Sequence, residues 1–351
     1  MNRRVFLKVL ALAGAGTAVA PGAWAAGAKT RWRMVLAWPK ELELYTQGAF
    51  RFAKQVSLLS ESRLAIDVGV APEGMTPQEV LGLVESGQAQ CAHCFTSALA
   101  PRSPALEWFS GVPFGMTARG FEAWMYRMGG LELLKELVMP FGLYAWPMGD
   151  AGPEVFGWSR GPLEGERALA GVRVPAQGMV AEVLARVGAK PQPQLRGGGA
   201  ALVAALGAGE LDVASWHGPH HETAAGLPDV ATHGLGPAWQ APSRRMMLCL
   251  NRGAYEALPA IVRKILGGVA QQMDHDISTA VGAANAVALG KLNARGRRVQ
   301  SLDASLLARL RALSAEVVAE RAATDPLATK VQVSYAAAQA VLGGLENLQP
   351  R

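Results

Sequence analysis

The sequence lacks a hydrophobic run long enough to cross a membrane. An apolar run from Val9 to Ala20 spans twelve residues, whereas a spanning helix needs about 20. No run of spanning length follows it, so we exclude a membrane channel. The run stands between the twin arginines of "NRRVFLK" and Ala23-Trp24-Ala25, a small-x-small cleavage pattern. Residues 1–25 are therefore predicted to be a twin-arginine-type signal peptide for export to the periplasm, with an uncleaved membrane anchor as the alternative.

Concentrated positive charge is also missing. The net charge is +6, from 34 Lys and Arg against 28 Asp and Glu, and it falls to +3 when Arg3, Arg4 and Lys8 are removed with the signal. The remaining basic residues are scattered, whereas a nucleic-acid-binding protein carries a concentrated basic stripe. We therefore expect no nucleic-acid partner.

Cysteine is scarce: three residues, an odd number for an oxidising compartment. Cys91 and Cys94 form "CAHC", and Cys249 is distant. A redox-active C-x-x-C opens a helix, but this motif ends an apolar run that is typical of a strand. A single pair is also a weak zinc signal. The favoured interpretations are buried thiols or an adventitious disulfide, and whether Cys91 and Cys94 are oxidised stays open.

What the sequence does contain is an alternation of strands and helices. Strands are predicted at 31–38, 63–70 and 91–95, and amphipathic helices at 42–59 and from Pro77 to Gly87. A second series follows Gly171, with strands at 171–176 and 212–216 and helices at 179–188 and 201–211. Such spacing predicts two α/β lobes with parallel or mixed sheets. The chain is expected to cross between lobes near residues 145–160, and long helices within 259–320 to brace both.

Two glycine-containing motifs match known functional motifs only in part. "GWSRG", residues 157–161, matches the nucleophile elbow of hydrolases, but the loop-like "PLEGERALAG" follows it where the elbow needs a helix. "LRGGGAAL", residues 195–202, lacks the spacing and the lysine of a phosphate-binding loop. We interpret it as a helix start that faces the cleft between lobes.

The stretch "LDVASWHGPHHETA" holds three histidines: His217, His220 and His221. Imidazoles bind zinc or copper. Gly218 and Pro219 interrupt the group, the neighbours His220 and His221 are expected to point apart, and no fourth ligand is recognisable nearby. Loop histidines at a cleft edge are the favoured interpretation, and metal binding through His217 and His220 is the alternative.

Several sequence blocks follow one another from "RWRMVLAWPK" to "KVQVSY". They include "SGQAQCAHC", "ALEWFSGVPFGMT", "EAWMYRMGG", "GDAGPEVFGW", "GELDVASWHGP" and "LNRGAYEALP". In this order and spacing they resemble the DctP-type solute-binding proteins of TRAP (tripartite ATP-independent periplasmic) transporters, in the branch of 2-oxo acid, monocarboxylate, mannitol and chloroaromatic receptors. The resemblance implies an α/β, two-lobed periplasmic-binding-protein fold of type II-like form, with the ligand cleft between lobes and long bracing C-terminal helices.

The resemblance also implies a ligand site. Trp216 matches the family's site tryptophan, Ser215 stands in place of a cation-binding glutamate, and Glu154 in place of a glutamine. Asp150 replaces a small or amide residue, and Ser97 an aromatic one. Without covalent cofactors, a Na⁺ or Ca²⁺ ion would accompany the ligand near Glu154, Ser215 and Trp216.

The family's carboxylate-binding arginine is the main departure. In an ungapped comparison Pro175 occupies its position, and Arg173, two residues earlier on the same strand face, is a candidate replacement. Two alternatives follow. A cation held by Glu154 bridges to an anionic ligand, or Asp150 and Glu154 repel carboxylates and favour a neutral, amine-bearing or metal-complexed ligand.

From these observations we expect a periplasmic receptor that closes its lobes on a small organic anion and delivers it to TRAP permease subunits, and not an enzyme. The predicted division is a signal at 1–25, lobe 1 at 26–150 with later segments, mainly lobe 2 at 151–250, and a bracing helical region at 251–351. Two alternatives remain: a periplasmic metal-binding protein or metalloenzyme built on His217, His220 and His221, and a degenerate receptor without a ligand. The sequence leaves a homodimer open.

Overall fold

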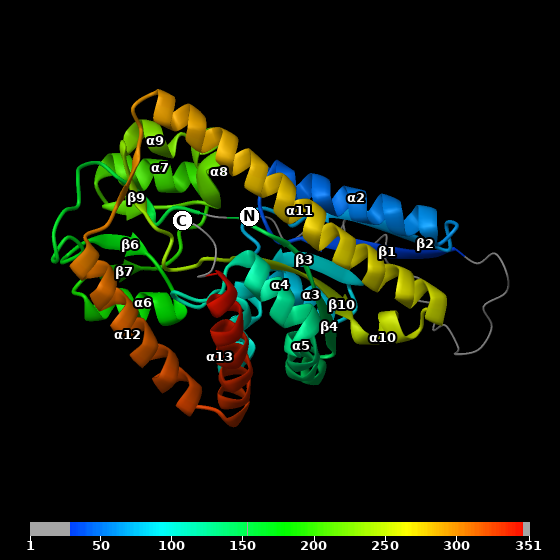
Figure 1. Ribbon diagram of the computed structural model, residues 1–351. Coiled ribbons are helices and arrows are strands. Elements are labelled where there is room, and N and C mark those ends of the chain that lie inside the picture. The colour runs from blue at the N-terminus through cyan, green and yellow to red at the C-terminus, as the bar shows by residue number, and fades with distance from the viewer. Residues whose placement is uncertain (1–28, 153, 347–351) are drawn as a thin grey trace.

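The structure is a computed structural model that describes residues 29–152 and 154–346 (Figure 1). The expected signal peptide lies outside these residues. Within the described chain, no helix combines the length and the apolar character needed to cross a membrane.

The first lobe is built on a five-stranded mixed sheet with the order β2-β1-β3-β10-β4. The first three strands are parallel, and β10 is antiparallel to both of its neighbours. Their bounds are β1 Thr30–Leu36, β2 Leu64–Val70, β3 Cys91–Phe95, β4 Leu143–Asp150 and β10 Arg245–Asn251. The strands expected at 31–38, 63–70 and 91–95 are thus confirmed, and β10 is a later segment that joins this sheet.

Helices cover both faces of the first sheet, because its strands alternate apolar side chains between the faces. Trp32, Met34 and Leu36 point into one core, and Val35 into the other. The first-lobe helices are α2 Glu43–Leu59, α3 Pro77–Glu85, α4 Ala118–Arg127, α5 Gly130–Val138 and α10 Arg252–Glu256, with 3₁₀ turns η1 Thr96–Ala98, η2 Ala100–Arg102, η3 Pro104–Phe109 and η4 Met139–Phe141.

Local signals set the ends of several helices. At the start of α3, Thr76 accepts a hydrogen bond from the Glu79 backbone N–H, and the Glu79 carboxylate accepts one from the Thr76 N–H. This capping box satisfies two of the free amides at the helix start. The sequence shows it as Thr-Pro-x-Glu, which is why this helix was predictable.

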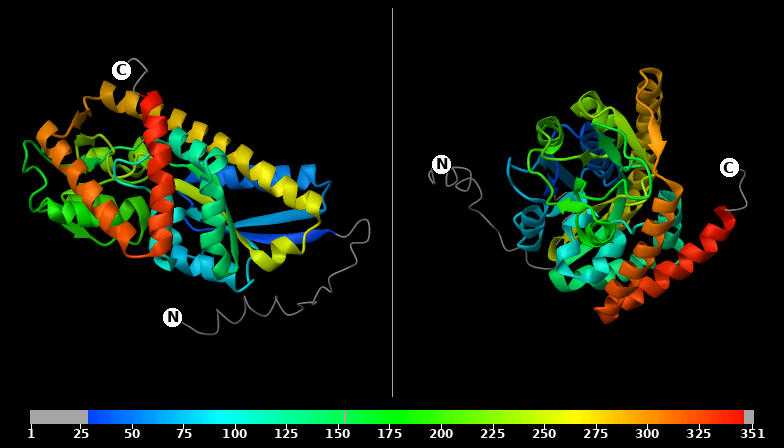
Figure 2. Two further views of the ribbon diagram at one scale, coloured as in Figure 1. Left: turned by 60° about the horizontal axis from the view of Figure 1, so that its bottom comes forward. Right: turned by 90° about the vertical axis from the view of Figure 1, so that its left-hand side faces the viewer.

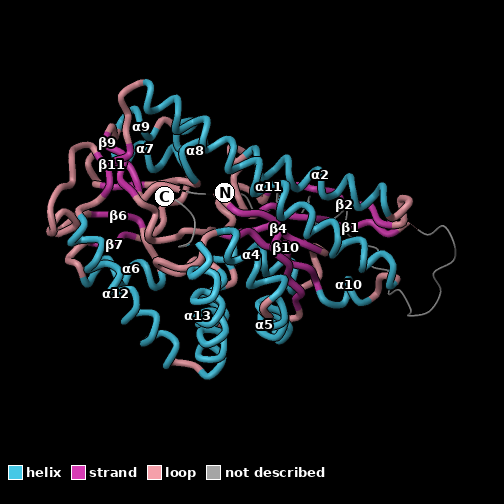
Figure 3. Tube along the Cα trace, in the orientation of Figure 1, coloured by secondary structure: helices cyan, strands magenta, loops and turns pink. Residues whose placement is uncertain are grey.

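The second lobe carries a four-stranded sheet, β11-β9-β5-β8, and the parallel pair β6-β7. The strands are β5 Gly157–Ser159, β6 Arg173–Pro175, β7 Lys190–Gln192, β8 Val213–Ala214, β9 His233–Gly236 and β11 Val299–Ser301. The helices are α6 Gly178–Arg186, α7 Gly198–Ala208, α8 Gly218–Ala225 and α9 Leu227–Val230. These second-lobe helices and strands lie at the left of Figure 3, apart from the larger sheet of the first lobe.

The chain passes between the lobes between β4 and β5, within the predicted crossing region, and returns between β9 and β10. A single helix of 35 residues, α11 Ala260–Ala294, then runs along both lobes (Figures 1 and 2). It packs on α2 and β4 of the first lobe and on α8 of the second. The bracing role expected for the long helices is confirmed for α11.

Two more helices complete the described chain. Helix α12 Ala304–Ala323 packs on α6 of the second lobe, and α13 Pro326–Glu346 packs on η3, α4 and α5 of the first. Arg186 on α6 contacts Glu320 on α12 at 2.5 Å. These contacts give the lobes a second connection, on the side opposite α11 (Figure 2).

Candidate functional site

The segment after β8 adopts a backbone that needs its particular residues. His217 has a φ of 57°, and Gly218 follows with a φ of 86°. A Cβ at Gly218 would lie 2.6 Å from the Asn285 side chain, so only glycine fits there. A non-glycine residue in the left-handed region costs about 1–3 kcal/mol and is typical of ligand sites. The strain at His217 therefore marks this turn as a candidate site.

Glu222 fixes the same turn from behind. Its carboxylate accepts hydrogen bonds from the Trp216 backbone N–H at 2.9 Å and from the Trp158 indole N–H at 2.7 Å. Because burial disfavours the charged form, the pKa of Glu222 rises to about 7, although both hydrogen bonds oppose the shift. The Trp216 ring in turn packs on Gly198 and Gly199 at the start of α7, the turn that the sequence placed at the cleft.

Aromatic rings of the first lobe face this turn. The Phe95 ring, at the end of β3, stacks on His217 with centroids 4.5 Å apart. Tyr45 on α2 meets Phe95 at 5.6 Å and His217 at 6.1 Å, both edge to face. Trp38 packs on Tyr45 at 5.8 Å. Aromatic side chains of the first lobe thus pack directly against the turn after β8 in the second.

Two charged residues belong to the segments where the chain crosses between the lobes. Glu154 lies between β4 and β5, and Arg244 directly precedes β10. The Arg244 guanidinium approaches the Glu154 carboxylate at 3.5 Å, and the two side chains are 30% and 0% exposed. Burial raises the pKa of Glu154, and the charge of Arg244 counteracts the rise.

Several buried polar atoms in this region have no hydrogen-bond partner among the described residues: both Glu154 carboxylate oxygens, the Tyr45 hydroxyl and His217 Nδ1. Burial, followed by the negative charge of Glu154, raises the pKa of Tyr45 well above its usual value. Burial and the nearby Arg244 charge lower the pKa of His217. Unsatisfied buried groups are costly, so this set is suited to a bound partner: an oxygen-seeking cation on Glu154 and an anion beside Arg244.

Asp150 has partners of its own. It accepts hydrogen bonds from Ser243 at 2.6 Å and from the Gly152 N–H at 2.7 Å, and it pairs with Arg245 at 3.4 Å. Arg245 also contacts Asp274 of α11 at 3.2 Å. Asp150 therefore belongs to a buried network in which one arginine pairs with two carboxylates.

The other sequence-predicted residues lie as follows. Arg173 on β6 forms a two-point ion pair with Asp212, at 2.7 and 2.9 Å, and Pro175 ends the same strand. Ser97, in η1, and Ser215, directly after β8, are half-buried. Glu154 thus lies in the segment that crosses between the lobes, Ser215 and Trp216 follow β8, and Arg173 is held in an ion pair.

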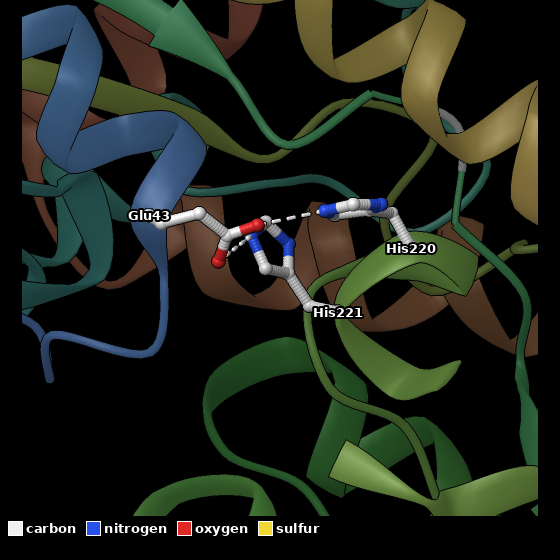
Figure 4. A group of neighbouring side chains, drawn as sticks. All are labelled: Glu43, His220 and His221. Atoms are coloured by element: carbon white, nitrogen blue, oxygen red, sulfur yellow. Dashed lines mark hydrogen bonds and ion pairs between the residues drawn. The ribbon is translucent and has the colours of Figure 1, made fainter. Parts of the chain in front are cut away.

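The histidine expectations need correction. His220 and His221 do not point apart: both lie on α8, and both Nε2 atoms approach the Glu43 carboxylate of α2 (Figure 4). His217 is the N-cap of α8, and its ring stacks on Phe95. Glu43 lies far from the histidines in the sequence, so the residues near them gave no sign of it.

The structure also bears on the expectations for Ser159 and for the cysteines. Ser159 ends β5 and donates its hydroxyl to the Gly161 carbonyl at 2.7 Å, with no helix directly after it, which rejects the nucleophile elbow. Cys91 and Cys94 point into different cores. The Cys94 sulfur instead lies 3.8 Å from that of Cys249, and all three thiols are free and buried.

Sequence reasoning missed Arg244 and Tyr45. Arg244 stands in "SRRMMLCLN" beside the strand-forming run of β10, and only the return of the chain between lobes brings it to Glu154. Tyr45 belongs to the apolar face of the predicted helix 42–59, where it was assigned to the core. Neither residue carries a local signal of its role.

Two α/β lobes, chain crossings and a buried polar site at their junction define a two-lobed periplasmic binding protein. Residues 36–325 match the family model for the bacterial extracellular solute-binding protein, family 7 (DctP). This match spans most of the chain, so the chain belongs to that family. Its members are solute-binding proteins outside the cytoplasm rather than an enzyme family, and the metalloenzyme alternative is not favoured.

Three relatives agree with this assignment. The chain is 28% identical over 332 residues, 93% of this chain and 90% of the relative, to a monocarboxylate 2-oxoacid-binding periplasmic protein of Nostoc sp.. A TRAP periplasmic solute-binding protein of Pseudoalteromonas atlantica T6c with bound sodium and pyruvate superposes with a TM-score of 0.84, at 28% identity, covering 90% of this chain and 96% of that one. A TRAP solute-binding protein of Bordetella bronchiseptica RB50, a mixed-occupancy dimer with calcium and picolinate, also reaches 0.84, at 25% identity and 92% and 95% coverage. The resemblance to TRAP solute-binding proteins and the two-lobed fold are confirmed.

Proposed function

We propose that this chain is a periplasmic TRAP receptor that captures a 2-oxo acid or related monocarboxylate together with Na⁺ or Ca²⁺. The observation that carries the proposal is the Glu154 carboxylate, whose two buried oxygens have no hydrogen-bond donor among the described residues and which lies 3.5 Å from Arg244. A hard cation takes carboxylate oxygens as ligands, and a guanidinium pairs with a carboxylate. Both partners of a cation–carboxylate pair therefore find a complementary group.

In the proposed site, Glu154 binds the cation and Arg244 the ligand carboxylate. Tyr45 and His217 offer polar atoms to the ligand, and Trp216 and Phe95 form its apolar walls. Ser97 and Ser215 remain proposed lining residues. Asp150 and Arg173 are left out because their charged groups already have hydrogen-bond partners, Ser243 and Gly152 for Asp150 and Asp212 for Arg173. Pro175 has no donor for an anion.

The sodium–pyruvate and calcium–picolinate complexes of the two relatives support a carboxylate with an accompanying cation. Capture by lobe closure requires no chemistry on the ligand, so the proposal includes no catalysis. Twin-arginine export and pairing as a homodimer also belong to the proposal; the dimer of the Bordetella bronchiseptica relative supports the latter.

Thermal unfolding of the mature chain, residues 26–351, tests the proposal. The panel contains pyruvate, longer 2-oxo acids, lactate, picolinate, mannitol and propylamine, each with sodium, with calcium and with a chelator. A ligand at about 100 times its dissociation constant adds roughly 2.7 kcal/mol to the free energy of unfolding. We expect a higher melting temperature with a 2-oxo acid or picolinate plus a cation. A shift with mannitol or the amine alone would contradict the carboxylate assignment.

A further inference from the structure

Three side chains of metal-ligating types meet at the junction of the lobes, beside the proposed ligand site: the His221 ring lies 4.9 Å from that of Tyr45. Glu43 is the first residue of α2 in the first lobe, and His220 and His221 lie on α8 in the second. Figure 4 shows the two imidazole rings turned toward the carboxylate. Within the described chain, these are the residues whose His and carboxylate ligand atoms gather in one place, all within 4.8 Å of one another.

The distances are close to those of a coordination shell. His220 Nε2 lies 2.9 Å from one Glu43 oxygen, and His221 Nε2 lies 4.0 Å from the other. In a tetrahedral zinc site with bonds near 2.0–2.1 Å, neighbouring ligand atoms are about 3.3 Å apart. Small side-chain rotations therefore suffice to place an ion among the three groups.

His221 supplies the observation that points to a ligand. Its side chain is fully buried, and its Nε2 has no hydrogen-bond partner among the described residues. Its Nδ1 lies 3.3 Å from the His217 carbonyl oxygen. A carbonyl only accepts, so Nδ1 carries the hydrogen and Nε2 presents a lone pair to the Glu43 carboxylate. Metal-binding histidines are commonly oriented in this way, through a carbonyl on the other ring nitrogen.

We propose that Glu43, His220 and His221 bind a transition metal ion of the Zn²⁺ type that bridges the two lobes beside the ligand site. Two imidazoles and one carboxylate are a zinc-like ligand set, whereas Ca²⁺ takes six to eight oxygens. The Glu43 and His220 side chains are 45% and 31% exposed, so an ion reaches the site from solvent, and water completes its coordination.

The bridge has a consequence for closure. Glu43 and the histidines belong to different lobes, so the ion binds only when α2 and α8 are close together. Bound metal would therefore favour the closed arrangement, and it would act separately from the oxygen-binding cation at Glu154. The two cation sites differ in their ligands: nitrogen-rich here, oxygen only at Glu154.

Isothermal titration of untagged mature protein with ZnCl₂ tests the site. We compare the unchanged chain with Glu43→Gln and His220→Gln, and use His275→Gln, an exposed histidine of α11, as the matched control. Removing one ligand is expected to raise the zinc dissociation constant at least tenfold, since even outer-shell changes cost about 10–100-fold. His275→Gln should bind as the unchanged chain does.

Equal zinc binding by all four proteins, or no zinc binding by the unchanged chain, would overturn the proposal. Binding of pyruvate with calcium serves as the fold check, because His220 lies outside the proposed ligand site. If His220→Gln loses zinc but keeps pyruvate, the metal site is supported independently. Failure of pyruvate, the longer 2-oxo acids, lactate and picolinate to bind to any of the four proteins, with zinc binding intact, would reject the proposed function and leave the metal site standing.

Discussion

The substitution Glu154→Gln is expected to act differently on ligand affinity and on the stability of the free protein. The carboxylate is fully buried, accepts no hydrogen bond from the described residues and has Arg244 at 3.5 Å. Gln keeps the shape of the side chain and removes the charge that would hold the cation. Truncating one partner of a buried charge pair at a binding site costs about 2–5 kcal/mol. We therefore expect ligand affinity to fall by about 30-fold or more.

The same change should have the opposite effect on the free protein. Burial raises the pKa of Glu154, so the ionised carboxylate costs stability above its ordinary titration range. A tenfold difference in proton affinity between the folded and unfolded chains corresponds to about 1.4 kcal/mol. An amide avoids that cost. Without ligand, Glu154→Gln should therefore unfold at the same or a higher urea concentration than the unchanged chain.

Two assays read this prediction. Calorimetric titration of pyruvate in calcium-containing buffer gives affinity, and urea unfolding at pH 8 gives stability. Glu164→Gln, an exposed glutamate of the second lobe, is the control and should change neither. The reasoning is refuted if Glu154→Gln binds pyruvate within twofold of the unchanged chain, or if it loses stability and affinity together.

Three more substitutions test the site and its support. Burial raises the pKa of Glu222 to about 7 in the folded chain. Because this pKa is higher in the folded than in the unfolded chain, Glu222 contributes to the free energy of unfolding below about pH 4.5, and that contribution is lost as the pH rises through 7. The stability difference between the unchanged chain and Glu222→Gln should therefore shift by up to about 3 kcal/mol between pH 5 and pH 8, measured by denaturant unfolding. Gly199→Ala places a Cβ 2.6 Å from the Trp216 ring; we expect a loss of about 1–3 kcal/mol and weaker pyruvate binding by calorimetry. Asp274→Ala leaves the buried Arg245 with fewer partners and should cost about 3 kcal/mol in urea unfolding.

The substitutions at Gly199 and Asp274 each have a matched control variant. Gly207→Ala, on the same helix as Gly199 and with open space around its Cβ, should be neutral or slightly stabilising. Asp276→Ala, two residues from Asp274 on the same helix, should change stability little. A pH-independent difference for Glu222→Gln, or equal effects at Gly199 and Gly207, would contradict the packing and charge assignments made above.

Much of the fold was predictable because its signals are local. The apolar face of α2, the alternation of β2 and the capping box of α3 are each written within one short segment. The crossing segment between β4 and β5 was also predictable, since a change from one strand–helix series to the next marks it. The membership of β10 in the first sheet depends on pairing with β3 and β4, which no local pattern contains.

The candidate site was predictable only in part. Trp216 and Glu154 follow from the resemblance, because they stand in recognisable blocks. Arg244 was missed because it reaches Glu154 through a return crossing about 90 residues later in the chain. The same-face argument for Arg173 concerned one strand and contained no information on Asp212, which binds its guanidinium.

His220 and His221 also show that the local sequence does not indicate which groups meet between the lobes. Adjacent residues on a helix point about 100° apart, which suggested divergence for His220 and His221. Both side chains nevertheless reach one carboxylate, because Glu43 of α2 lies between the directions in which they extend (Figure 4). Only the packing of the two lobes supplies that third group.

A crystal structure of the mature protein grown with pyruvate and calcium tests the central claim most directly. The account predicts a calcium ion, identified by its anomalous signal, within about 2.3–2.6 Å of a Glu154 oxygen, and the pyruvate carboxylate on the Arg244 guanidinium. Pyruvate bound at Arg173 with Asp212 displaced, or calcium distant from Glu154, would contradict it.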